Sequence, residues 1–113
     1  MKYTFMELPL FAQHRQAYFD DEQFRVFQNF LSANPYAGNS IAGTGGLRKI
    51  RWADPGRGKG KRGGTRTIYF VHDGIDQIWL FTIYDKDMAD DLTADQKRQL
   101  KERLDYEKAQ FVR

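Results

Sequence analysis

Three β-prone runs follow one another in the middle of the chain and constrain its fold more than any other feature. They are LRKIRWA (47–53), TRTIYFVHD (65–73) and QIWLFTIYD (77–85). The first alternates, which places Ile50 and Trp52 on one face and the intervening cations on the other. The last is apolar almost throughout, as is typical of a strand covered on both faces. Because Asp73-Gly74 is a turn signal, we expect the second and third runs to form an antiparallel hairpin.

Signals for helices lie on both sides of these strands. After a β-prone segment at 2–8, Pro9 can open a helix at its first turn. Asp20 and Thr93 each precede, by three residues, a glutamine that can complete a capping box, which predicts two further helix starts. The glycine-rich stretch 36–46 is expected to be a loop. The order β-α-α-β-β-β-α over 113 residues predicts one α+β domain, residues 1–113.

Apolar side chains recur at helical spacing in the second and third helices. They are expected to be core residues rather than contacts to a cofactor, because amphipathic helices bury their apolar stripe. The second helix carries Phe24, Phe27, Phe30 and Leu31, and the last carries Leu100, Leu104 and Phe111.

Positive charge is concentrated in one short segment. Residues 45–66 hold eight of the 18 basic residues and one acid, Asp54, and so carry +7, whereas the remainder carries −4. The eight are Arg48, Lys49, Arg51, Arg57, Lys59, Lys61, Arg62 and Arg66. Fixed cations on strands, continued by a glycine-rich cationic loop at 55–64, make a surface suited to a polyanion.

The sequence gives little support for a metal site, a nucleotide cofactor or a membrane segment. The chain has no Cys and two His, and its acidic cluster at 85–96 lacks the Gly and Glu that a calcium loop needs, so no metal site is expected. The GxGxxG match at 58–63 lies between strands rather than between a strand and a helix, so no nucleotide cofactor is expected. No segment approaches the length of a membrane span or of a signal peptide, and we expect a cytoplasmic protein with no membrane partner.

Several of these motifs occur together in one known family. The stretches GTGGLRKIRWADPGRGKGKRGGTRTIYF and LFTIYDKDMADDLTADQKRQL resemble the HigB branch of the RelE/ParE toxin superfamily. These proteins are the toxins of bacterial type II toxin–antitoxin systems. The resemblance covers most of the chain and is dense from Gly43 to Leu100.

The resemblance implies a RelE-like fold, with helices packed on a twisted antiparallel sheet. It implies an mRNA interferase, a metal-independent endoribonuclease that cleaves mRNA in the ribosomal A site and so inhibits translation. The implied partners are mRNA, the ribosome with its ribosomal RNA, and a cognate helix-turn-helix antitoxin. Operator DNA would be bound only through the antitoxin complex.

The same resemblance assigns residues to the site. Lys49 and Arg51 of the first strand and Arg66 of the second are implied to be catalytic cations, and Tyr84 and Lys86 follow from the TIYDK motif. Arg48 and the loop cations Arg57, Lys59, Lys61 and Arg62 are expected to bind RNA phosphates. Some relatives place an aromatic residue or an arginine where this chain has Asp87 and Thr93, so the identity of the general base stays open.

The chemistry of RNA fits these residue types. RNA carries its own nucleophile, the 2′-OH, and its attack on the adjacent phosphate gathers negative charge that guanidinium groups stabilise. A lysine or tyrosine crowded by cations would have a lowered pKa and could accept the 2′-OH proton. The expected products are a 2′,3′-cyclic phosphate, or its opened 3′-phosphate, and a 5′-OH.

Two alternatives remain open at this point. A toxin of the same fold could act on another target such as gyrase, because fold does not determine function. A non-catalytic module that binds nucleic acid would also use the basic segment.

Overall fold

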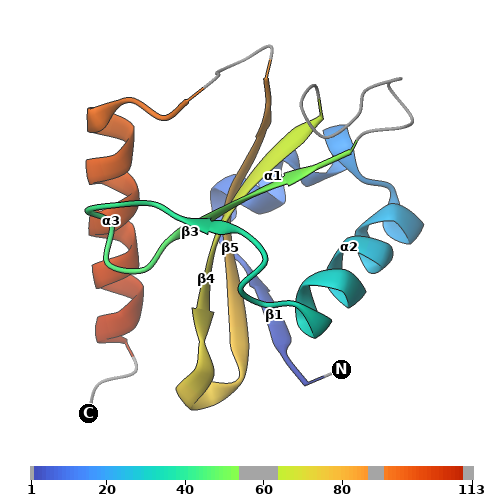
Figure 1. Ribbon diagram of the computed structural model, residues 1–113, viewed down its shortest axis with the longest axis horizontal. Helices are drawn as coiled ribbons and strands as arrows, with labels where there is room; N and C mark the ends of the chain where they lie inside the picture. Colours follow the sequence, from blue (N-terminus) through green and yellow to red (C-terminus); the bar gives the residue numbers. More distant parts are fainter. Residues whose placement is uncertain (1, 54–63, 87–90, 111–113) are drawn as a thin grey trace.

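The computed structural model describes residues 2–53, 64–86 and 91–110, which form three helices and a five-stranded sheet (Figure 1). The elements are β1 (Thr4–Glu7), α1 (Pro9–Tyr18), α2 (Asp21–Ala33), β2 (Asn39–Ser40), β3 (Arg48–Trp52), β4 (Thr65–His72), a short 3₁₀ helix η2 (Asp73–Ile75), β5 (Gln77–Asp85) and α3 (Ala94–Ala109). The predicted α+β class is confirmed. Within these residues, none of the helices has the length and apolar character needed to cross a membrane.

The strands are ordered β1-β5-β4-β3-β2, and helices cover both faces of the sheet (Figure 1). The antiparallel arrangement expected from the sequence holds for β2 to β5, whereas β1 pairs parallel to β5 and makes the sheet mixed. Alternation of apolar residues identifies a strand but not its direction, so this pair could not be predicted. The loop expected at 36–46 also contains β2, which is too short to show alternation.

One face of the sheet carries α1 and α2. Both predicted helix starts are confirmed, since Pro9 opens α1 and Asp20 forms a capping box with Gln23 at α2. The core on this face is rich in aromatic rings: Phe11, Phe19, Phe24, Phe27 and Leu31 pack against Ile50, Tyr69, Leu80 and Ile83. Phe30 departs from the expected stripe because it is 38% exposed.

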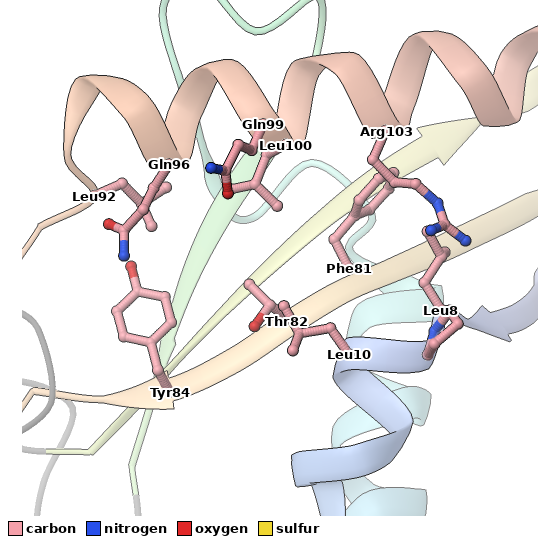
Figure 2. A pocket seen from close by; sticks show the side chains of 11 residues that line it. Leu8, Leu10, Phe81, Thr82, Tyr84, Leu92, Gln96, Gln99, Leu100 and Arg103 are labelled. Carbon is pink, nitrogen blue, oxygen red and sulfur yellow. The ribbon is translucent and has the colours of Figure 1, made fainter.

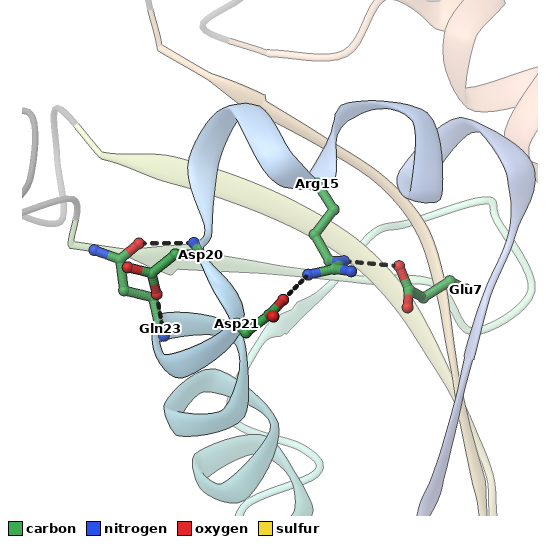
Figure 3. Close-up of polar contacts among 5 residues, drawn as sticks. All are labelled: Glu7, Arg15, Asp20, Asp21 and Gln23. Atoms are coloured by element: carbon green, nitrogen blue, oxygen red, sulfur yellow. Dashed lines mark hydrogen bonds and ion pairs between the residues drawn. The ribbon is translucent and has the colours of Figure 1, made fainter.

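Arg15 ties the first three elements of the chain together. Its Nε lies 3.2 Å from Glu7 Oε1 and its second nitrogen lies 3.7 Å from Asp21 Oδ1 (Figure 3). Its guanidinium carbon also lies 4.5 Å from the centre of the Phe24 ring. One side chain therefore contacts β1 in the sheet and both helices that pack beneath it.

A β-bulge changes the facing of residues along β5. Ile68 pairs with Thr82 but Tyr69 pairs with Leu80, so Phe81 has no partner in β4. Leu80 belongs to the core beneath α1 and α2, while Phe81 packs on the opposite face. The extra residue shifts the alternation of β5 by one position. As a result Ile83 faces α1 and α2 and Tyr84 faces α3, the reverse of what strict alternation from Leu80 would give.

The opposite face of the sheet is covered by α3. Its predicted start is confirmed by a capping box between Thr93 and Gln96. Leu104 is fully buried among Leu47, Ile68, Trp79 and Phe81, and Leu100 packs at the margin of this cluster. Phe111, expected to complete the stripe, lies outside the described residues. Among the described residues of α3, Leu104 is the one that is fully buried.

We expect Leu104→Ala to lower the free energy of unfolding by about 2–5 kcal/mol, because it removes buried methyl groups and leaves a cavity. A loss of that size is a large part of the 5–15 kcal/mol typical of a small domain. Denaturant unfolding followed by far-UV circular dichroism measures it. Tyr106→Ala, at an exposed position of α3, is the matched control and should change stability by less than about 0.5 kcal/mol.

Candidate nucleic-acid interface

Three of the residues expected at the site lie in one row across three strands. Arg51 on β3 is directly opposite Arg66 on β4, and Arg66 is directly opposite Tyr84 on β5. Residues directly opposite each other in antiparallel strands share a face. Lys49, two residues before Arg51, lies on the same face. We call Lys49, Arg51, Arg66 and Tyr84 the cation face; it is the face that α3 partly covers.

The two arginines of the cation face differ in accessibility. Arg51 is exposed, whereas Arg66 is 3% exposed and donates a hydrogen bond of 3.1 Å to the Gly64 carbonyl. Like charges directly opposite each other on neighbouring strands are destabilising. Because Arg51 is exposed and Arg66 is buried, an anion that approaches this face meets Arg51 first, and the charge of Arg66 lies just beneath it.

Lys49 is held by a carboxylate that the sequence did not assign to the site. Its side chain is 17% exposed and its Nζ lies 3.0 Å from Asp91 Oδ1. The hydrogen bond and the charge of Lys49 lower the pKa of Asp91, so this carboxylate is ionised at neutral pH. Asp91 belongs to the acidic cluster at 85–96, for which the sequence predicted no binding role. The contact joins residues 42 positions apart, and no local sequence pattern signals it.

Tyr84 does not have the lowered pKa that its cationic neighbours suggested. Its ring is 8% exposed, and its hydroxyl has no hydrogen-bond partner among the described residues. Burial raises the pKa of Tyr84 and outweighs the opposing effect of Arg66 and Arg51. Figure 2 shows the ring pointing from β5 toward Gln96 of α3. In this arrangement Tyr84 holds its proton and can donate it, but it is a poor base.

A cavity of about 420 Å³ opens beside Tyr84, between α3, β5 and the start of α1 (Figure 2). Its walls are mostly apolar and include Leu8, Leu10, Phe81, Leu92 and Leu100. Leu10 of α1, which is 48% exposed, lines this cavity.

The remaining expected residues lie elsewhere. Lys86 is exposed directly after the end of β5. Arg48 is on the opposite face of β3, where it donates a 2.7 Å hydrogen bond to the Gly38 carbonyl and lies 4.8 Å from the centre of the Tyr36 ring. Arg57, Lys59, Lys61 and Arg62, together with Asp87, lie outside the described residues. No three His, Cys, Asp or Glu side chains come together to hold a metal ion in the described part of the chain.

The fold and this face define a small α+β protein with a cation-bearing sheet between helices. No family model matches the sequence. Among solved structures, the chain is similar to a mutant of the Escherichia coli toxin RelE in the free state, with a TM-score of 0.57 and 15% sequence identity. The similarity covers 80% of this chain and 90% of that one. The predicted RelE-like fold is therefore confirmed.

We expect the phenol of Tyr84 to ionise above the ordinary value of about 10 for tyrosine. Absorbance at 295 nm, titrated for the protein and for Tyr84→Phe, isolates this group by difference. Since the folded state holds the proton more tightly than the unfolded chain, the stability that Tyr84 contributes is complete below the ordinary pKa and is lost as the pH rises through the folded-state pKa. A difference titration centred below 10 would contradict this assignment.

Proposed function

We propose that the protein is the toxin of a type II toxin–antitoxin system and cleaves mRNA on the ribosome as a metal-independent endoribonuclease. The observation that carries the proposal is the cross-strand row Arg51–Arg66–Tyr84 with Lys49 beside it. A phosphate bound at Arg51, with the charge of Arg66 beneath it, would receive charge-assisted hydrogen bonds from a guanidinium group. The RelE fold and the HigB-like motifs support the same assignment.

In this proposal the RNA supplies the nucleophile. The 2′-oxygen bonds to the adjacent phosphorus, the bond from phosphorus to the 5′-oxygen breaks, and a 2′,3′-cyclic phosphate and a 5′-OH result. Arg51 contacts the non-bridging oxygens, and Arg66 beneath it strengthens the positive potential as negative charge develops. Lys49 adds an ammonium contact to the phosphate when the phosphate replaces Asp91 as its partner.

Proton transfer divides between different groups. Tyr84 carries its proton at neutral pH and is suited to donate a hydrogen bond to a phosphoryl or leaving oxygen. The acceptor of the 2′-OH proton is then Lys86, which must be a neutral amine at that step, and the leaving 5′-oxygen takes its proton from Tyr84. The ribosome orients the mRNA in the A site, which compensates for the absence of a paired acid and base among the residues that the structure describes.

The partners follow from the toxin assignment. A helix-turn-helix antitoxin binds and silences the protein, and the pair binds operator DNA through the antitoxin. The loop cations Arg57, Lys59, Lys61 and Arg62 bind ribosomal RNA phosphates without reading sequence. The site of action is the cytoplasm, where translating ribosomes are found.

Arg51→Ala tests the function directly. We expect it to reduce cleavage by translating ribosomes about 10²- to 10³-fold, the usual loss on removing one donor to a developing anion. Primer extension on a message, with purified protein and ribosomes, measures the cut. Arg98→Ala on α3 removes the same charge from an exposed ion pair and should cleave normally.

Intact messages in every reaction, with circular dichroism confirming folded protein, would overturn the proposed function. DNA breakage without message cleavage would instead identify a same-fold toxin acting on gyrase. Salt-dependent RNA binding without any cut product would identify a non-catalytic binding module.

Asp91→Asn should strengthen RNA binding by releasing Lys49. A surface ion pair is worth about 0.2–1 kcal/mol, so we expect affinity for single-stranded RNA to rise up to about five-fold at low salt. The log–log salt dependence should steepen by about 0.7, as for one added phosphate contact. Fluorescence anisotropy at several salt concentrations measures both quantities.

Asp95→Asn is the matched control, because Asp95 also lies at the start of α3 but pairs with Arg98. If both variants tighten binding equally, the effect comes from net charge rather than from Lys49.

A further inference from the structure

The outer edge of β3 is only half covered. β2 pairs with Arg48 and Lys49 through two residues, and its continuation adds a hydrogen bond of 2.9 Å from the Ile41 amide to the Leu47 carbonyl. Backbone groups of alternate residues in an antiparallel strand point to the same side. The carbonyl of Leu47 points outward, toward the chain that follows β2. The amide and carbonyl of Arg51, four residues later, therefore point outward as well. Among the described strands, none pairs with Arg51 on that side.

A hollow of about 400 Å³ lies at this open edge, between β3 and α2. Its walls include the rings of Phe30 and Trp52, which lie 5.2 Å apart between centres. Phe30 is 38% exposed, and Trp52 is partly buried. Phe30 presents its apolar ring to the hollow, whereas Phe27 and Leu31 on the same helix are buried in the core.

The same hollow is bordered by two residues of the cation face. Arg51 and Lys49 both line it, although their side chains project from the other face of β3. A nucleotide contains both groups that this edge can bind, an anionic phosphate and a flat aromatic base. With its phosphate at Arg51, a nucleotide can reach around the strand edge and place its base against Phe30.

We propose that this hollow is a binding site for one unpaired base of single-stranded RNA. The base stacks on Phe30, lies beside the ring of Trp52, which is inclined by 57° to that of Phe30, and exchanges hydrogen bonds with the outward amide and carbonyl of Arg51. Stacking tolerates every base, so the subsite holds the strand without selecting sequence strongly. The inference rests on the proposed function for its ligand, but it assigns residues on the far side of β3 that take no part in the chemistry.

The test compares two ligands of equal charge: a pentameric adenylate RNA and a pentameric chain of abasic residues. Phe30→Ala should weaken binding of the adenylate RNA roughly 5- to 150-fold, the range for loss of one stacked base. It should leave binding of the abasic chain unchanged. Arg51→Ala should weaken both ligands, because it removes a phosphate contact.

Val26→Ala is the matched control, since Val26 is an exposed apolar residue of α2 one turn from Phe30 and does not line the hollow. The adenylate should also quench the emission of Trp52, and Trp52→Phe should abolish that change, because the other tryptophan, Trp79, is fully buried in the core on the α3 side.

Equal losses for both ligands in Phe30→Ala, no loss for either, or no binding of the adenylate at low salt would overturn the subsite. These outcomes are separate from the cleavage assay. A protein that cuts mRNA but shows no base-dependent effect of Phe30 retains the proposed function and lacks the subsite. A protein that shows the base-dependent effect without cutting has a nucleic-acid-binding role only.

Discussion

The pairing of β4 with β5, and the bulge within it, decides what the sheet can present. Tyr84 lies three residues after the unpaired Phe81. If β5 alternated strictly through Phe81, with no bulge, Tyr84 would face the aromatic core beneath α1 and α2. The bulge instead brings it into line with Arg66 and Arg51, while the strand before it still fills both cores. Bulges often re-aim a side chain near a functional site, and this one builds the cation face.

Charge and burial act against each other on this face. Arg66 is almost fully buried next to a second arginine, and Tyr84 is buried with an unsatisfied hydroxyl among the described residues. A buried hydroxyl without a hydrogen bond costs stability, and core packing alone would not select it. The carboxylate of Asp91 offsets part of the charge by binding Lys49. Because Asp91 is exposed, an incoming polyanion can displace it at low cost.

The sequence predicts the local features of this fold and misses those that depend on distant contacts. The capping boxes at Asp20 and Thr93 and the placement of Ile50 and Trp52 follow from neighbouring residues, so they could be predicted. The parallel pairing of β1, the bulge and the Asp91 contact join segments far apart in the chain. The raised pKa of Tyr84 was missed for a related reason, since charged neighbours are visible in a sequence and desolvation is not.

The charges of β3 have a second explanation, because lysine and arginine on an edge strand also prevent pairing with other molecules. That explanation accounts for Arg51 but not for Lys49, which β2 already covers, nor for the surroundings of either residue. A protected edge gains nothing from a partly exposed phenylalanine beside a tryptophan, which adds apolar surface where association must be avoided. Aromatic rings next to cations at an open strand edge are instead the combination that binds unpaired nucleotides. The edge of β3 therefore fits a continuation of the proposed RNA-binding surface better than a guard against aggregation.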